Sequence, residues 1–137
     1  MTFSIVGRCA RTGMFGVAIT TSSICVGSRC PHVRAGVGAV ATQNITDPHL
    51  ATLVLDARAA GQDATAAIAS VVKNRENISY RQLTAVDARG MTAHFTGTNI
   101  LGTHAVSVAA DCVAAGNLLS SKAVAKAISD GFGVDPS

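Results

Sequence analysis

Hydrophobic and polar residues alternate in the first twenty positions of the chain, in two runs separated by a polar segment. The first run, residues 3–8, carries Phe3 and Ile5, and the second run covers residues 15–20. Gly13 lies between them, where it permits the positive φ of a tight turn. The pattern predicts a β-hairpin that begins almost at the first residue of the chain.

Residues 35–43 form a third apolar run, rich in glycine and alanine. Glycine weakens a strand but lets a neighbouring backbone come close, so this run predicts a buried strand. We expect residues 35–41 to be a central strand beside the hairpin. Before it, residues 24–26 are expected to be extended and residues 28–34, which contain Pro31, to be irregular.

Two consecutive helices are predicted next, at residues 47–61 and 63–74. Asp47 followed by Pro48 is a strong start signal, because an aspartate caps the helix and proline suits its first turn. Asp63 is a second capping residue, and apolar residues recur after it at helical spacing.

The second half of the chain returns to strands and ends with a helix. The expected order is strands at residues 82–87, 91–95, Ala105–Ala109 and 113–117, a helix from Ser120 or Ser121, and a frayed end over residues 131–137. Such segregated elements are typical of an α+β fold. We therefore expect one domain over residues 1–137, with two packed sheets and the first two helices covering one outer face.

Composition narrows the function classes without naming one. The chain has 137 residues, of which 48% are hydrophobic and 14% charged, enough apolar material for a core. Its net charge of +3 is small, and its arginines and lysines are not clustered with aromatic residues, so the sequence does not indicate nucleic-acid binding. No apolar run has the length of a membrane span, and no signal-peptide pattern is present. We therefore expect a cytoplasmic protein with no nucleic-acid or membrane partner.

Thr2 directly follows the initiator methionine and opens the first predicted strand. Removal of Met1 would leave Thr2 with a hydroxyl and a free α-amine, whose reference pKa is about 7.7–8.0. A neutral amine can accept the proton of the adjacent hydroxyl, so the pair is a nucleophile with its own base. The alternative, which the sequence leaves open, is that Thr2 only starts a strand.

Five short segments carry a resemblance to a known family. They are Thr2-Phe3-Ser4-Ile5-Val6, the block from Arg34 to Gln43, Val86-Asp87, Phe95-Thr96-Gly97 and Gly116-Asn117-Leu118. These segments resemble the bacterial domain-of-unknown-function family ten-twenty-eight. That family looks like a member of the N-terminal-nucleophile (Ntn) hydrolase superfamily, whose αββα four-layer sandwich is shared with proteasome β-subunits. The resemblance implies a hydrolase that cleaves an amide bond, and it implies no cofactor. The family does not name a substrate, and we expect a small molecule that carries a carboxylate.

The chain departs from the family pattern in two respects. Family chains continue past the last predicted helix with further strands, so the resemblance implies a sandwich that lacks its usual C-terminal strands. Proteasome-type relatives place a lysine beside the nucleophile, whereas the first lysine here is Lys73. Arg29 or Arg34 would have to replace it, and arginine does not act as a base.

The resemblance also implies which residues gather around Thr2. In the sandwich, the end of the strand at residues 35–43 arrives beside Thr2, so backbone N–H groups there or the Gln43 amide are candidate donors to a developing oxyanion. Asn117, at the end of a later strand, is a second donor or orients the Thr2 amine. Thr2, Gln43 and Asn117 are thus the expected catalytic residues.

Four further residues are expected to bind the substrate. Thr42 precedes Gln43, and Ser22 and Ser23 follow the second predicted strand, whose end lies beside Thr2 in the hairpin. Arg34 is the expected partner of the substrate carboxylate, although about 3.3 Å per residue of extended strand separates it from the end of that strand. For the hydroxyl residues, an ordinary polar strand end is the alternative.

The remaining chemistry of the sequence concerns metals and partners. Cys25, Cys30 and His32 lie close together but match no common zinc spacing, so no metal site is expected. The expected partners are a small-molecule substrate and further copies of the chain, because a shortened sandwich exposes sheet edges and apolar surface. The competing hypothesis is a non-catalytic small-molecule-binding or structural protein with the same fold.

Overall fold

The computed structural model describes residues 1–135, and this part of the chain alternates between strands and helices. The elements are β1 (Thr2–Arg8), β2 (Phe15–Thr21), η1 (Val26–Ser28), β3 (Pro31–Arg34), β4 (Gly38–Asn44), α1 (Pro48–Ala59), α2 (Ala64–Val72), η2 (Ile78–Tyr80), β5 (Arg81–Asp87), β6 (Thr92–Thr96), β7 (Ala105–Ala109), β8 (Cys112–Asn117) and α3 (Ala123–Val134). The labels η1 and η2 denote short 3₁₀-helices. The order confirms the α+β pattern expected from the sequence.

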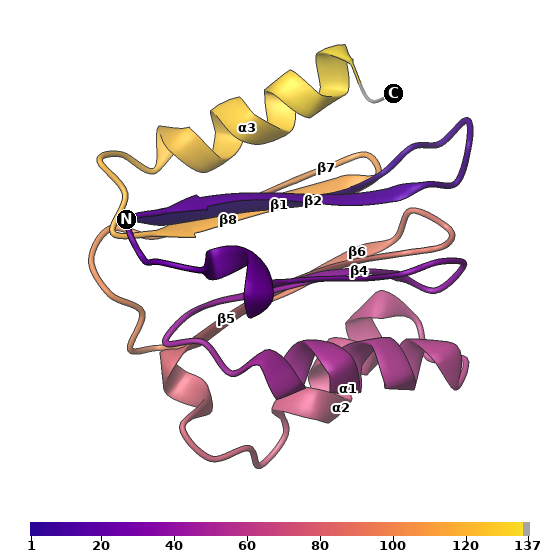
Figure 1. The fold of residues 1–137 in the computed structure, drawn as a ribbon, viewed down its shortest axis with the longest axis horizontal. Coiled ribbons are helices and arrows are strands. Elements are labelled where there is room, and N and C mark those ends of the chain that lie inside the picture. The colour runs from indigo at the N-terminus through magenta and orange to yellow at the C-terminus, as the bar shows by residue number, and fades with distance from the viewer. Residues whose placement is uncertain (136–137) are drawn as a thin grey trace.

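The strands of the described residues form two antiparallel sheets of four strands each. The first has the order β2-β1-β8-β7 and the second the order β3-β4-β5-β6. The sheets lie face to face, with α3 over the outer side of the first and α1 and α2 over the outer side of the second (Figure 1). The two helices of residues 47–74 therefore cover one outer face, as expected.

β1 lies inside the first sheet, between β2 and β8. Thr2 is paired with Thr21 on one side and with Asn117 on the other. Because strand side chains alternate, Ser4 and Val6 share the face that points toward the second sheet, and both are buried. The start of the chain is thus a central strand, which explains its alternating pattern from the first residues onward.

The helices α1 and α2 begin where the sequence signals place them. The Asp47 side chain accepts a hydrogen bond from the His49 N–H, and the Asp63 side chain accepts one from the Ala66 N–H. Their buried faces pack on β4 and β5 in a core that includes Leu50, Val54, Leu55, Ile68, Val71 and Leu83. Among the described helices, none is both long and apolar enough to cross a membrane.

A second, smaller core fills the space between the sheets. It contains Val6, Ala39, Ala41, Val86 and Val113, each at most 1% exposed. Alanines at two of these positions let the sheets come close together. By the strand register, this apolar cluster lies toward the Arg8 end of β1, which leaves the Thr2 end to polar residues.

The helix α3 extends further than the sequence suggests. Residues 131–137 have the composition of a frayed end, but α3 continues to Val134, while residues 136–137 lie outside the described part. The reason is a contact with β1: a Cβ at Gly7 would lie 2.7 Å from the Phe132 ring. The absence of a side chain at Gly7 lets the last turn of α3 pack onto the sheet.

The strand expected at residues 35–41 is a correction to the sequence analysis. β4 begins at Gly38 and belongs to the second sheet, so it faces β1 and does not extend the hairpin. The residues before it form a turn, in which Gly36 has a φ of 72° and the Val37 N–H donates to the Arg34 carbonyl at 3.1 Å. A buried apolar strand has the same pattern in either sheet, so the pattern alone did not decide the sheet.

Two shorter segments also differ from expectation. Residues 28–34 look irregular because of Pro31, yet Pro31–Arg34 forms β3. β3 is an edge strand, where a missing N–H is tolerated. Residues 24–26 look extended, but Cys25 adopts a left-handed conformation with φ of 55° and leads into η1.

Candidate functional site

The candidate nucleophile Thr2 opens β1 at one end of the space between the sheets. Its hydroxyl is hydrogen-bonded to the hydroxyl of Thr21, with 2.8 Å between the two Oγ1 atoms. The Thr21 hydroxyl also accepts the N–H of Ser23 at 3.1 Å. The position of the Thr2 hydroxyl is therefore tied to the end of β2.

Asn117 lies on the opposite side of Thr2, at the end of β8. It is 2% exposed, and its Nδ2 atom has no hydrogen-bond partner among residues 1–135. β8 runs close to β1 here, since a Cβ at Gly116 would lie 2.9 Å from the Thr2 carbonyl oxygen. Leu118 follows with a φ of 52°, an uncommon conformation for a bulky residue, and turns the chain away from the sheet. A buried, unpaired amide donor therefore stands next to Thr2.

Met1 extends the β1–β2 ladder by one residue. The Ser22 N–H donates to the Met1 carbonyl at 3.2 Å, and the Met1 amine lies 3.4 Å from the Ser22 Oγ. In this form the Thr2 nitrogen belongs to a peptide bond and has no basic lone pair. Loss of Met1 would free both the Thr2 amine and the Ser22 N–H.

A chain of buried polar groups connects the two sheets beside Thr2. The Ser4 hydroxyl donates to Gln43 Oε1 at 2.8 Å, and Gln43 Nε2 donates to Gln82 Oε1 at 2.8 Å. Gln82 Nε2 then donates to the Gly116 carbonyl at 3.4 Å, so this series of hydrogen bonds ends on the first sheet. All three side chains are at most 2% exposed. These bonds link β1, β4, β5 and β8 at the end where Thr2 lies.

The structure gives the three expected catalytic residues different relations to one another. Thr2 and Asn117 are direct partners in the sheet register. Gln43 reaches this end of the molecule, but its amide is bonded to Ser4 and Gln82. Gln43 is therefore connected to Thr2 through β1 rather than by a hydrogen bond to the Thr2 hydroxyl.

Two of the expected substrate-binding residues point elsewhere. Thr42 is fully buried on the face of β4 that meets α1, where its hydroxyl donates to the Asp47 carbonyl at 3.4 Å. Side chains alternate along a strand, so Thr42 and Gln43 cannot share a face. Arg34 lies on the far end of the β3–β4 hairpin and pairs with Asp56 at 2.9 Å. The structure thus gives neither residue a contact with Thr2.

Ser22 and Ser23 lie beside Thr2, as the hairpin predicts, and both are exposed. The Ser23 hydroxyl accepts a hydrogen bond from Arg29 Nη2 at 2.8 Å. Arg29 therefore belongs to the surroundings of Thr2, whereas Arg34 does not.

Three residues of this region were missing from the sequence-based site: Ser4, Thr21 and Gln82. The first two had a signal, because alternation puts Ser4 on the Thr2 face and the hairpin register puts Thr21 opposite Thr2. Gln82 had none, since its place depends on the pairing of β5 with β4.

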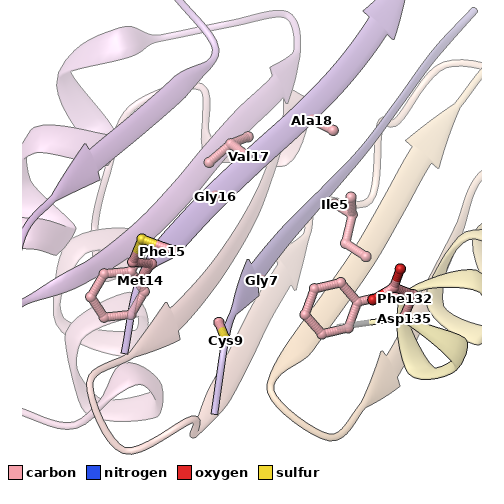
Figure 2. Close-up of a pocket in the computed structure, with 10 residues that line it drawn as sticks. All are labelled: Ile5, Gly7, Cys9, Met14, Phe15, Gly16, Val17, Ala18, Phe132 and Asp135. Atoms are coloured by element: carbon pink, nitrogen blue, oxygen red, sulfur yellow. The ribbon is translucent and has the colours of Figure 1, made fainter. Parts of the chain in front are cut away.

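Surface hollows occur on the opposite face of the first sheet. Figure 2 shows one of about 370 Å³ on the outer side of β1 and β2, lined by Ile5, Gly16, Ala18 and Phe132 among others. Its lining residues do not include Thr2, whose side chain belongs to the inner face.

Cysteine and metal chemistry add little to this region. The Cys9 thiol at the rim of that hollow has a pKa below its ordinary value, because the Thr12 hydroxyl and backbone N–H bond to it. Burial and the neighbouring Asp111 carboxylate raise the pKa of the Cys112 thiol. Among residues 1–135, no three His, Cys, Asp or Glu side chains are arranged to hold a metal ion.

Comparisons with known proteins give a family and a fold neighbour. The model of a family of unknown function, DUF1028, matches residues 2–136. The crystal structure of protein SPO2555 from Silicibacter pomeroyi superposes with a TM-score of 0.94 at 29% sequence identity. The match covers 99% of this chain but only 63% of that protein, so the chain spans less than two thirds of its length. A comparison with curated proteins found no match.

We predict that Gln82→Leu destabilises the protein by about 1–3 kcal/mol, because Gln43 Nε2 would lose its acceptor in a buried space. Gln62→Leu is the matched control, since Gln62 is exposed and should change stability by less than about 0.5 kcal/mol. Urea unfolding of both variants measures the difference. Equal losses of stability in the two variants would contradict a stabilising role for the buried hydrogen bonds that join Ser4, Gln43 and Gln82.

Proposed function

The chain belongs to the family of unknown function DUF1028, and we propose that it is a hydrolase of the N-terminal-nucleophile type. In this proposal the two sheets and their covering helices form the αββα sandwich of that superfamily. The reaction is hydrolysis of an amide bond in a small substrate, with Thr2 as the nucleophile after removal of Met1. No cofactor is required, because nucleophile and base come from one residue.

The observation that carries the proposal is the unpaired amide of Asn117 beside the Thr2 hydroxyl. A buried polar group without a partner costs free energy, so native proteins satisfy most of them. Asn117 Nδ2 is one of seven buried side-chain atoms without a hydrogen-bond partner among residues 1–135, and it is the one that belongs to a sheet partner of Thr2. A tetrahedral intermediate on Thr2 would supply an oxyanion for this donor. The cost of leaving it unpaired would then be offset in the transition state.

The reaction follows from the two groups on Thr2. The free amine takes the hydroxyl proton as Oγ1 attacks the amide carbonyl carbon, and Asn117 Nδ2 donates to the resulting oxyanion. The protonated amine then gives this proton to the leaving nitrogen, and the C–N bond breaks to leave an ester on Thr2. Water, deprotonated by the same amine, hydrolyses the ester and restores the hydroxyl.

The surrounding residues have supporting roles in the proposal. Thr21 positions the Thr2 hydroxyl through its 2.8 Å hydrogen bond, and Ser4 and Gln43 hold the end of β1 against the second sheet. Ser22 and Ser23 remain substrate-facing groups. Thr42 and Arg34 have no part in it, since their side chains bond to Asp47 and Asp56. No lysine is needed, because the α-amine is the base.

We predict that the chain freed of Met1 is acylated at Thr2 by a β-lactone, an electrophile that traps hydroxyl nucleophiles. Tryptic peptides analysed by mass spectrometry should carry the adduct on the peptide that ends at Arg8. Thr2→Ala should abolish the adduct and Thr2→Ser should retain it. Thr20→Ala, on the exposed face of β2, is the matched control and should react like the parent.

Intact mass and the adduct test together decide between this proposal and its competitor. Loss of Met1 during expression supports the hydrolase. Retention of Met1, or no adduct on the chain once Met1 has been removed enzymatically, favours the non-catalytic small-molecule-binding or structural protein.

We predict that Asn117→Ala slows the acylation of Thr2 by about 10²–10³-fold, the typical effect of losing one oxyanion donor. The Asn117 Nδ2 atom has no hydrogen bond to lose in the resting protein. The substitution should therefore lower the acylation rate strongly while changing the free energy of unfolding little. Asn99→Ala is the control, because Asn99 is exposed and its side chain bonds to Ser79. A normal acylation rate in Asn117→Ala would remove this residue from the reaction.

The proposal retains a cytoplasmic location and a homo-oligomer. The apolar hollow on the outer face of β1 and β2 and the neutral edge strand β2 offer a surface for a second copy (Figure 2). We predict that light scattering gives at least twice the mass of the chain. A mass equal to one chain at high protein concentration would contradict it.

A further inference from the structure

Arg29 lies in the loop between η1 and β3, at the end of the molecule where Thr2 is found. Figure 1 shows η1 at this end, beside the N-terminus. Arg29 is a half-buried residue, and its guanidinium donates from Nη1 to the Ile24 carbonyl at 2.6 Å and from Nη2 to the Ser23 hydroxyl at 2.8 Å. Two bonds hold its side chain in one place.

The charge of Arg29 is not balanced by a carboxylate. Both of its acceptors are neutral, and it forms no ion pair with any residue from 1 to 135. The carboxylates in the ion pairs of other cations are those of Asp56, Asp87, Asp111 and Asp130. A guanidinium has five N–H donors in a planar fork, so donors remain for an anion from outside the chain.

Hydrogen bonds connect Arg29 to the candidate nucleophile. Arg29 binds the Ser23 hydroxyl, the Ser23 N–H donates to Thr21 Oγ1 at 3.1 Å, and Thr21 Oγ1 is 2.8 Å from Thr2 Oγ1. The base of the arginine is also fixed, since the next residue, Cys30, accepts the Thr42 N–H at 3.0 Å and is thereby tied to β4. Ser23 and Thr21 therefore connect the cation to the Thr2 hydroxyl.

We propose that Arg29 binds the carboxylate of the substrate, the role that the sequence suggested for Arg34. The substrate class is then a small amide with a free carboxylate, of which an N-acyl amino acid is the simplest example. The reaction of this substrate rests on the proposed function of Thr2. The binding of its carboxylate does not, and this separates the two tests.

The test measures binding on the Thr2→Ala chain freed of Met1, which lacks the nucleophile. N-acetylglycine is titrated into ¹⁵N-labelled protein while the arginine Nε–H and backbone amide signals are recorded by NMR. The Arg29 Nε–H and the Ser23 amide should shift and saturate. The methyl ester of the same compound lacks the charge and should bind at least about tenfold more weakly. This is the loss of affinity expected when one hydrogen bond to a charged group is removed.

Two arginine variants form the matched comparison. Arg29→Gln should lower the affinity for N-acetylglycine by at least about tenfold, while Arg34→Gln, which only breaks the pair with Asp56, should leave it unchanged. Arg29→Lys should bind more weakly than the parent but better than Arg29→Gln, because it keeps the charge and loses the fork. Backbone amide signals of residues 21–30 that match those of the parent before the titration show that the loop keeps its structure in Arg29→Gln.

The outcomes separate the possible anions. Shifts centred on Arg34, or no shift at Arg29 up to high millimolar concentration, would overturn the proposal even if Thr2 reacts with the β-lactone. Inorganic phosphate at the same concentration as N-acetylglycine is added as a competitor. If phosphate binds as tightly and displaces N-acetylglycine, the site accepts any small anion, which would overturn the substrate class. Arg29-dependent binding in a chain whose Thr2 never reacts would support the carboxylate site and reject the hydrolase.

Discussion

The pairing of β1 with a strand on each side is the constraint on which the rest of the structure depends. One ladder, to β2, is local and forms through the hairpin, whereas the other, to β8, joins the two ends of the chain. This second ladder brings Asn117 beside Thr2 and carries α3 onto the outer face, where Phe132 packs against Gly7. A slip of one residue would turn Ser4 and Val6 outward and break both the core and the polar chain.

The space between the sheets is divided along the strands into an apolar half and a polar half. Val6, Val86 and Val113 fill the first half and need no partners. The second half holds buried carboxamides, which are tolerated only when they are hydrogen-bonded. Gln43 and Gln82 are bonded to each other, to Ser4 and to the Gly116 carbonyl. The Asn117 amide, at the end of a strand that borders Thr2, is among the buried atoms that lack a hydrogen-bond partner in residues 1–135.

The groups that the proposed reaction needs come from separate elements. β1 supplies the hydroxyl, β8 the amide and the loop before β3 the arginine. Each group is fixed by backbone pairing or by hydrogen bonds to main-chain atoms, as Arg29 is by the Ile24 carbonyl. The hydroxyl and the amide thus lie on strands, which hold a site more precisely than loops do, whereas the arginine lies on a loop.

The sequence by itself determined the α+β class, the hairpin at residues 2–21, the capped starts of α1 and α2, and the neighbourhood of Thr2 with Ser22 and Ser23. These features depend on local signals: alternation, capping side chains and the register of a short hairpin. Alternation also predicts that Thr42 and Gln43 face opposite sides of their strand, although the site expected from the sequence included both residues.

Only the tertiary structure decided which strands became neighbours. It placed β4 in the second sheet, put β8 beside β1, and connected Ser4 to Gln82 through Gln43. It also paired Arg34 with Asp56 and placed Arg29 in a hydrogen bond with Ser23. The physical reason is that a buried apolar strand has the same pattern in any sheet position, so its partners are chosen by long-range packing that no local window of sequence contains.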